Sequence, residues 1–201
     1  KYALILNPDT ILDKDTLQNF LTCASEIKDF GLLGPYFQTG KEKKFEINSD
    51  PISVDNIRGF AMFLNLKKFN NIGFFDENFF LYFEDIDLCK RVILSGNKIY
   101  LLPNVIINHE GAKSVNFKND EELEVNRNWH WMWSSFYYYK KYDGYPFAFL
   151  KMFGKLLSAA IKTFVYFLTF NSQKRKIYSS RLSGILNSIL MKKSWYRPKI
   201  H

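Results

Sequence analysis

The feature that most constrains the fold is the segment 79–109, in which two adjacent acids interrupt strongly apolar sequence. The apolar run 79–83 leads directly into Glu84 and Asp85. The apolar positions that follow recur at helical spacing: Leu88, Cys89, Val92 and Ile93. Ionised carboxylates in apolar surroundings are costly unless they are paired, bind a metal or exchange a proton. The pattern therefore predicts an acidic pair at the point where an extended segment turns into a helix.

Two short apolar strands are expected after this helix, at 99–102 and 105–107, with Pro103 as a break between them. The second strand leads to His109. A lone histidine at a strand end is either a buried structural residue or a metal ligand, and both interpretations stay open here. A carboxylate pair followed by a helix, a strand and a histidine is a sequence order that is compatible with a catalytic site.

The N-terminal residues 2–6 form a continuous apolar run, which predicts a buried parallel strand. Asn7, Pro8 and Asp9 follow at once, where open α/β sheets bind ligands. The same tripeptide is also typical of a plain turn. Asp9 is the single carboxylate offered there to a hard divalent cation.

Gly59 interrupts an expected strand at 57–66. Its first interpretation is a bulge in the strand. Its second is a stretch of bare backbone that lets a ligand approach closely.

The net charge of +8 is concentrated in the C-terminal part of the chain. Residues 1–139 hold 15 Lys or Arg against 19 Asp or Glu, whereas residues 140–201 hold 13 against one. The excess of positive charge therefore bears on what residues 140–201 would bind. The two cysteines, Cys23 and Cys89, fall on apolar helical positions, so no disulfide framework is expected.

Residues 147–170 are apolar except for three lysines that share one helical face. No uninterrupted run reaches the length that a membrane-spanning helix needs. A helix of this kind is typical of one lying in the headgroup plane of a membrane. The alternative is a helix packed on its own domain with its lysines in solvent. The expected apolar face comprises Phe149, Met152, Phe153, Leu156, Ala160, Phe164 and Phe167.

An ordered set of motifs resembles glycosyltransferase family 2, and among its members the bacterial rhamnosyltransferase-like enzymes that build cell-surface polysaccharide. The resemblance covers about residues 2–141. It is carried by Asn7-Pro8-Asp9, Gly73-Phe74-Phe75-Asp76-Glu77, Phe79-Phe80-Leu81-Tyr82, Glu84-Asp85-Ile86-Asp87-Leu88-Cys89-Lys90-Arg91, Gly96, Pro103 and His109.

The resemblance implies an α/β fold: the C-terminal part of a GT-A fold with a mixed sheet, followed by an amphipathic helical tail. The expected domains are a partial catalytic domain at 1–142 and a basic membrane-docking tail at 143–201. The N-terminal nucleotide-binding half is expected to be missing, and the fragment alone is expected to be inactive.

The resemblance also assigns roles. Asp85 is the expected catalytic base, and Glu84 either orients it or pairs with Arg91. Asn7, Asp9 and Gly59 are the residues expected to contact the donor, a nucleotide-diphosphate sugar, with rhamnose as the sugar suggested. Asp9 and His109 are the expected ligands of a divalent cation, Mg²⁺ or Mn²⁺. The implied reaction is an inverting, metal-dependent transfer to a hydroxyl group.

The expected partners are the nucleotide sugar, a lipid-linked or polysaccharide acceptor, and an anionic membrane surface at the cytoplasmic face of the bacterial inner membrane. Nucleic acid is not expected, because the basic residues alternate with apolar stripes at helical spacing. Two alternatives remain open: a non-catalytic membrane-associated fragment, and a basic nucleic-acid-binding protein.

Overall fold

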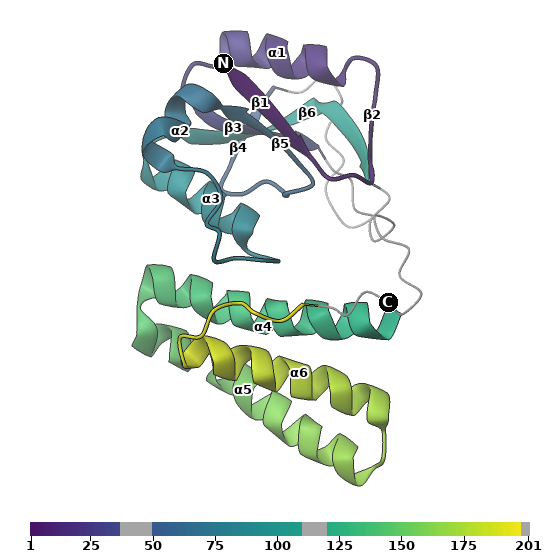
Figure 1. The fold of residues 1–201 in the computed structure, drawn as a ribbon. Coiled ribbons are helices and arrows are strands. Elements are labelled where there is room, and N and C mark those ends of the chain that lie inside the picture. Colours follow the sequence, from purple (N-terminus) through teal and green to yellow (C-terminus); the bar gives the residue numbers. More distant parts are fainter. Residues whose placement is uncertain (37–49, 110–119, 198–201) are drawn as a thin grey trace. The chain divides into compact units, whose positions relative to one another are not determined.

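The computed structural model describes residues 1–36, 50–109 and 120–197, without the side chains of Asn108, His109 and Asp120. Contacts along the chain divide it into two compact units (Figure 1). The α/β unit comprises residues 1–75 and 85–116. The helical unit comprises residues 76–84 and 117–201.

The α/β unit is built on a mixed sheet, as predicted. Its strands are β1 (Tyr2–Leu6), β2 (Thr10–Leu12), β3 (Phe30–Tyr36), β4 (Ile52–Val54), β5 (Ala61–Asn65) and β6 (Lys98–His109). The order is β1-β5-β3-β6-β2, and β4 pairs with β6. Only β3 and β6 run parallel among the described strands. The prediction that residues 2–6 form a buried parallel strand is wrong, because β1 pairs antiparallel with β5 at the end of this order and is half-buried.

Helices cover both faces of this sheet (Figure 1): α1 (Thr16–Glu26) lies on one face, and α2 (Leu66–Ile72) and α3 (Glu84–Leu94) lie on the other. Side chains of β5 alternate between the two layers. Phe63 stacks on Phe20 of α1 at a centroid distance of 5.0 Å, while Met62 packs in the cluster that contains Leu88 of α3. Full burial of a side chain such as Leu88 contributes about 1.5–3 kcal/mol.

The predicted break at Pro103 is wrong, because β6 is one strand that runs through this residue. The pairing with β3 slips instead: Pro35 faces Leu102, but Tyr36 faces Ile106. Because proline has no N–H to donate to a ladder, a shift of register at this point removes the need for one.

The strand expected at 57–66 is shorter than predicted. Only Ala61–Asn65 pair as β5, and Leu66 begins α2, which the sequence analysis did not anticipate. The residues before α3 were expected to be extended and form bends instead, with Tyr82 and Phe83 at φ values of 66° and 70°.

The helical unit contains α4 (Asp120–Asp143), α5 (Tyr145–Leu168) and α6 (Ser172–Ile189). Its core is formed by Met132, Phe136, Ala148, Met152 and Ile185. By contacts, α4 belongs with these C-terminal helices, although the predicted boundary followed residue 142. The division into a catalytic domain and a docking tail stays a prediction. Among the helices described, none combines the length and hydropathy needed to cross a membrane.

Small residues of α6 let it approach α4 closely. A Cβ atom at Gly184 would lie 2.3 Å from the carbonyl oxygen of Trp129, which only a glycine avoids. One turn to either side, the hydroxyls of Ser180 and Ser188 donate to carbonyl groups of α4 at 2.7 and 3.0 Å. The two helices are therefore joined through backbone contacts as well as side chains.

The expected apolar face of α5 is partly buried and partly exposed: Met152 packs against the other helices, whereas several of its phenylalanines do not. Ala148, Met152 and Ala159 are buried against the other helices. Of the expected apolar face, Phe153, Phe164 and Phe167 are exposed. The exposed apolar side chains of α5 are Phe147, Leu150, Phe153, Leu157, Ile161, Phe164, Val165, Phe167 and Leu168, which we call the α5 outer face.

Candidate active site

The Asn7-Pro8-Asp9 segment forms a tight turn between β1 and β2. The backbone N–H of Thr10 donates to the carbonyl of Asn7 at 3.2 Å, and the Thr10 hydroxyl donates to the same oxygen at 2.7 Å. The N–H of Asn7 donates to the carbonyl of Phe60 at 2.8 Å. The turn is therefore attached to the residue that follows Gly59.

Asp85, on α3, contacts Gly59. Its Oδ2 accepts a hydrogen bond of 2.9 Å from the backbone N–H of Gly59, and its Oδ1 accepts one of 2.8 Å from the N–H of Ile86. Asp85 is also the second residue of α3, where the helix dipole favours a negative charge. Both oxygens are thus oriented by backbone groups, and each keeps a further acceptor position.

Gly59 is close-packed against this carboxylate. A Cβ atom there would lie 3.0 Å from Cβ of Asp85 and 3.1 Å from its Oδ2. The bare backbone at position 59 therefore admits the Asp85 side chain. Contact with a donor substrate, the role expected for Asn7 and Gly59, stays a prediction.

His109 ends β6 opposite Thr10 of β2, so its backbone lies beside the residue that follows Asp9. Its side chain lies outside the described part of the structure. The described side chains contain no group of three or more His, Cys, Asp or Glu that would hold a metal ion. The assignment of Asp9 and His109 as metal ligands therefore stays a prediction.

Arg91 pairs with Asp87 and not with Glu84. Its Nε donates to Oδ2 of Asp87 at 2.9 Å, across one turn of α3. Its Nη1 donates to the carbonyls of Ile72 and Gly73 at 2.8 and 3.0 Å. Asp87 is fully buried, and the Arg91 side chain that pairs with it is 18% exposed.

Glu84 begins α3 and is half-buried. By contacts it belongs to the helical unit, whereas Asp85 belongs to the α/β unit. Its charge acts on Tyr82: burial is the main cause that raises the pKa of the phenol, the Arg127 guanidinium opposes it, and Glu84 adds to the rise. Orientation of Asp85 by Glu84 stays a prediction.

Two other reactive residue types are structural here. Burial raises the pKa of the Cys89 thiol to about 12, so it stays protonated. Cys23 and Cys89 are both free, as predicted. His130 is fully buried; its Nε2 contacts the carbonyl of Tyr196 at 2.9 Å and its Nδ1 contacts the Ser194 hydroxyl at 3.1 Å. Asp85 differs from these residues in having a carboxylate oriented by two backbone N–H groups.

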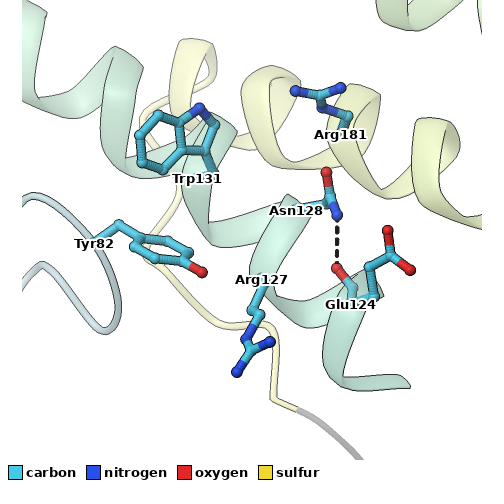
Figure 2. Close-up of a pocket in the computed structure, with 6 residues that line it drawn as sticks. All are labelled: Tyr82, Glu124, Arg127, Asn128, Trp131 and Arg181. Carbon is cyan, nitrogen blue, oxygen red and sulfur yellow. Dashed lines mark hydrogen bonds between the residues drawn. The ribbon is translucent and has the colours of Figure 1, made fainter. Parts of the chain in front are cut away.

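A cavity in the helical unit was missed by the sequence analysis. It has a volume of about 380 Å³. Figure 2 shows the residues that line it: Tyr82, Glu124, Arg127, Asn128, Trp131 and Arg181. The four from α4 recur at spacings of three and four, a signal that was present in the sequence but was hidden among the many aromatic residues of this helix.

The chain is 28% identical over 131 residues to the rhamnosyltransferase WbbL of Escherichia coli (strain K12). The match covers 51% of this chain and 49% of WbbL, so the chain spans about half the length of this curated relative. No family model matches the chain, and no solved structure matches it. The similarity to WbbL supports a glycosyltransferase-like relationship, in agreement with the class that the motifs suggested.

Proposed function

We propose that this chain acts in a glycosyltransferase that moves a sugar, with rhamnose as the first to test, from a nucleotide-diphosphate donor to a hydroxyl group in cell-surface polysaccharide synthesis. The similarity to WbbL supports the class of enzyme. The single observation that carries the chemistry is the carboxylate of Asp85, oriented by two backbone N–H groups beside Gly59. Family 2 membership and a GT-A fold belong to the same proposal.

In this proposal Asp85 is the general base. An acceptor hydroxyl attacks the anomeric carbon of the donor sugar, and its proton passes to a free acceptor position on the Asp85 carboxylate. The bond between the anomeric carbon and the diphosphate oxygen breaks, and the leaving nucleoside diphosphate takes the electron pair. One displacement from the opposite side inverts the configuration at that carbon.

The residues proposed for the metal suit a divalent cation chemically. Asp9 offers a carboxylate and His109 an imidazole, a mixed set that Mn²⁺ accepts and that Mg²⁺ accepts with water completing its shell. The pairing of Thr10 with His109 joins the backbones of the two segments that carry them. When bound, the cation would neutralise charge that develops on the leaving diphosphate.

Exchange of Asp85 for asparagine tests this function. In the complete chain of the enzyme, Asp85→Asn should lower turnover by about 10²–10⁴-fold, because the amide cannot take the proton. Binding of the nucleotide sugar, measured by calorimetry, should change little. Asp50→Asn, an exposed carboxylate of the same unit, is the matched control. Full turnover in Asp85→Asn would remove this residue as the base.

We propose further that the α5 outer face docks on an anionic membrane. Leu150 is 71% exposed and Phe164 is 62% exposed, an unusual cost for side chains of this size. Lys155 and Lys162 are exposed on the same helix, and Arg175 is exposed at the start of α6. An apolar face bordered by cations fits a surface of acyl chains below anionic headgroups. The inner-membrane location rests on this charge and apolar pattern.

A further inference from the structure

The cavity of Figure 2 carries an inference that does not depend on the transfer reaction. Every residue that lines it belongs to the helical unit. Figure 2 shows the Tyr82 and Trp131 rings on one side, with Arg181 of α6 across from them. The walls thus combine aromatic faces with cationic groups, a composition that selects for a particular kind of ligand.

Two guanidinium groups of the cavity have no anionic partner among the residues that the structure describes. Nε of Arg181 is buried without a hydrogen bond, and the guanidinium lies 5.6 Å from the centre of the Tyr178 ring. Arg127 makes no hydrogen bond or ion pair with any residue in the described ranges, and Glu124 is not paired with either arginine there. A buried guanidinium nitrogen without an acceptor is unfavourable. Two guanidinium groups line the cavity against one carboxylate, Glu124, so an anionic ligand would balance their charge.

The rings of Tyr82 and Trp131, which form the aromatic wall of the cavity, contact each other and neighbouring residues. Trp131 meets Tyr82 edge to face at a centroid distance of 5.3 Å and is tilted against Phe83 at 5.4 Å, yet remains 39% exposed. The carbonyl of Leu81, next to Tyr82, accepts a hydrogen bond of 2.8 Å from the Ser134 hydroxyl. Tyr82 and Phe83 also keep left-handed backbone conformations, which persist only where surrounding contacts hold them and which concentrate at ligand sites.

We propose that this cavity binds a phosphorylated saccharide. Arginines recognise phosphate oxygens through paired N–H donors. An exposed indole face supplies a flat apolar surface for a sugar ring, and the Asn128 side chain offers an amide beside it, although its Nδ2 already donates to the Glu124 carbonyl at 2.8 Å. The phosphate belongs either to a soluble sugar phosphate or to the headgroup of a polyprenyl carrier, since both present the same oxygens.

Binding measurements on the intact chain test the proposal. Glucose 1-phosphate and pyrophosphate serve as soluble probes in calorimetry, with glucose as the neutral comparison. Polyprenyl phosphate in phosphatidylcholine vesicles serves as the carrier probe. Arg127→Gln and Arg181→Gln should each weaken binding of the phosphorylated probes by about tenfold or more. Trp131→Leu should weaken glucose 1-phosphate while leaving pyrophosphate unchanged.

Arg175→Gln is the control for the soluble probes, because it removes the same charge from an exposed site on α6. Arg181→Lys keeps the charge but loses the paired donors, and should bind with intermediate affinity. Binding of the soluble probes without the vesicles identifies a soluble sugar phosphate as the source. Binding of the vesicles without the soluble probes identifies the polyprenyl carrier. The proposal is overturned if neither source binds, or if the cavity variants bind the soluble probes as tightly as Arg175→Gln does.

Discussion

The backbone N–H of Gly59 donates a hydrogen bond of 2.9 Å to Oδ2 of Asp85, and a Cβ atom at position 59 would lie 3.1 Å from that oxygen. The contact leaves no room for a methyl group without a shift of the carboxylate. The proposed base is therefore positioned by a residue that has no side chain.

We expect Gly59→Ala to reduce turnover by about 10–100-fold, because a displaced carboxylate no longer meets the acceptor proton in line. The added methyl group should also lower the free energy of unfolding by about 1–3 kcal/mol. Turnover assays and urea unfolding measure the two effects. The control is Gly154→Ala, since a Cβ at this α5 position meets no atom within 4 Å. It should instead raise stability by about 0.5–1 kcal/mol; equal effects of the two variants would contradict the argument.

Loss of Arg91 should destabilise the α/β unit. Asp87 has no exposed side-chain surface, and Arg91→Gln would remove the cation that pairs with its carboxylate at 2.9 Å. We expect a loss of about 2–3 kcal/mol in chemical unfolding, below the range for a wholly buried pair because the Arg91 side chain is 18% exposed. Lys90→Gln, at the exposed neighbouring position, should change stability by less than about 0.5 kcal/mol. Similar losses in both would show that the ion pair is unimportant.

His130 should make stability depend on pH. Burial lowers the pKa of the imidazole to about 4, with Arg197 adding to the fall and the hydrogen bond to the Tyr196 carbonyl opposing it. The folded pKa lies below the unfolded value of about 6.5. Acid therefore protonates the unfolded chain first, so stability is complete above about pH 6.5 and falls as the pH drops toward 4.

The loss over that range should be about 3 kcal/mol, and the curve should level off once the folded protein also takes the proton. Denaturant unfolding between pH 4 and 7 measures it. Carboxylates titrate in the same range, so the quantity of interest is the difference between the native chain and His130→Gln. A difference that stays constant with pH would mean that His130 does not titrate as described.

The membrane proposal predicts a selective effect of acidic substitutions. Leu150→Glu and Ile161→Glu place a charge in the α5 outer face and should abolish sedimentation with phosphatidylglycerol vesicles. Both side chains are exposed, so the fold should persist in circular dichroism. Leu94→Glu, at a residue of α3 that is 65% exposed, is the control and should sediment as before. Unchanged sedimentation of the α5 variants would exclude this face as the docking surface.

Much of the local structure could be predicted because it follows from short-range pattern. The helical spacing after Asp85 gives α3, the alternation of lysines with apolar residues gives α5, and the mixed sheet agrees with the expected α/β class. Only the family resemblance assigned Asn7, Gly59 and Asp85 to one site; in the structure Asn7 donates to Phe60, the residue after Gly59. Nothing local in the sequence places Gly59 against Asp85, 26 residues later in the chain.

The errors come from interactions between elements. Pro103 breaks a strand by its own preference, but a shift of register with β3 absorbs it. Arg91 has the sequence pattern of a surface residue, yet its guanidinium donates hydrogen bonds to the carbonyls of residues 72 and 73. Ala148 and Ala159, which lie outside the expected apolar face of α5, are buried because small residues permit close helix packing.

Gly184 lies about one turn after Arg181 on α6. Because Gly184 has no side chain, α6 packs directly against the Trp129 carbonyl of α4. This close packing fixes the position of α6, and with it the backbone of Arg181, along α4. A side chain that is already ordered loses little conformational entropy when a ligand binds, which favours binding. Glycine at position 184 therefore helps to fix the orientation of Arg181.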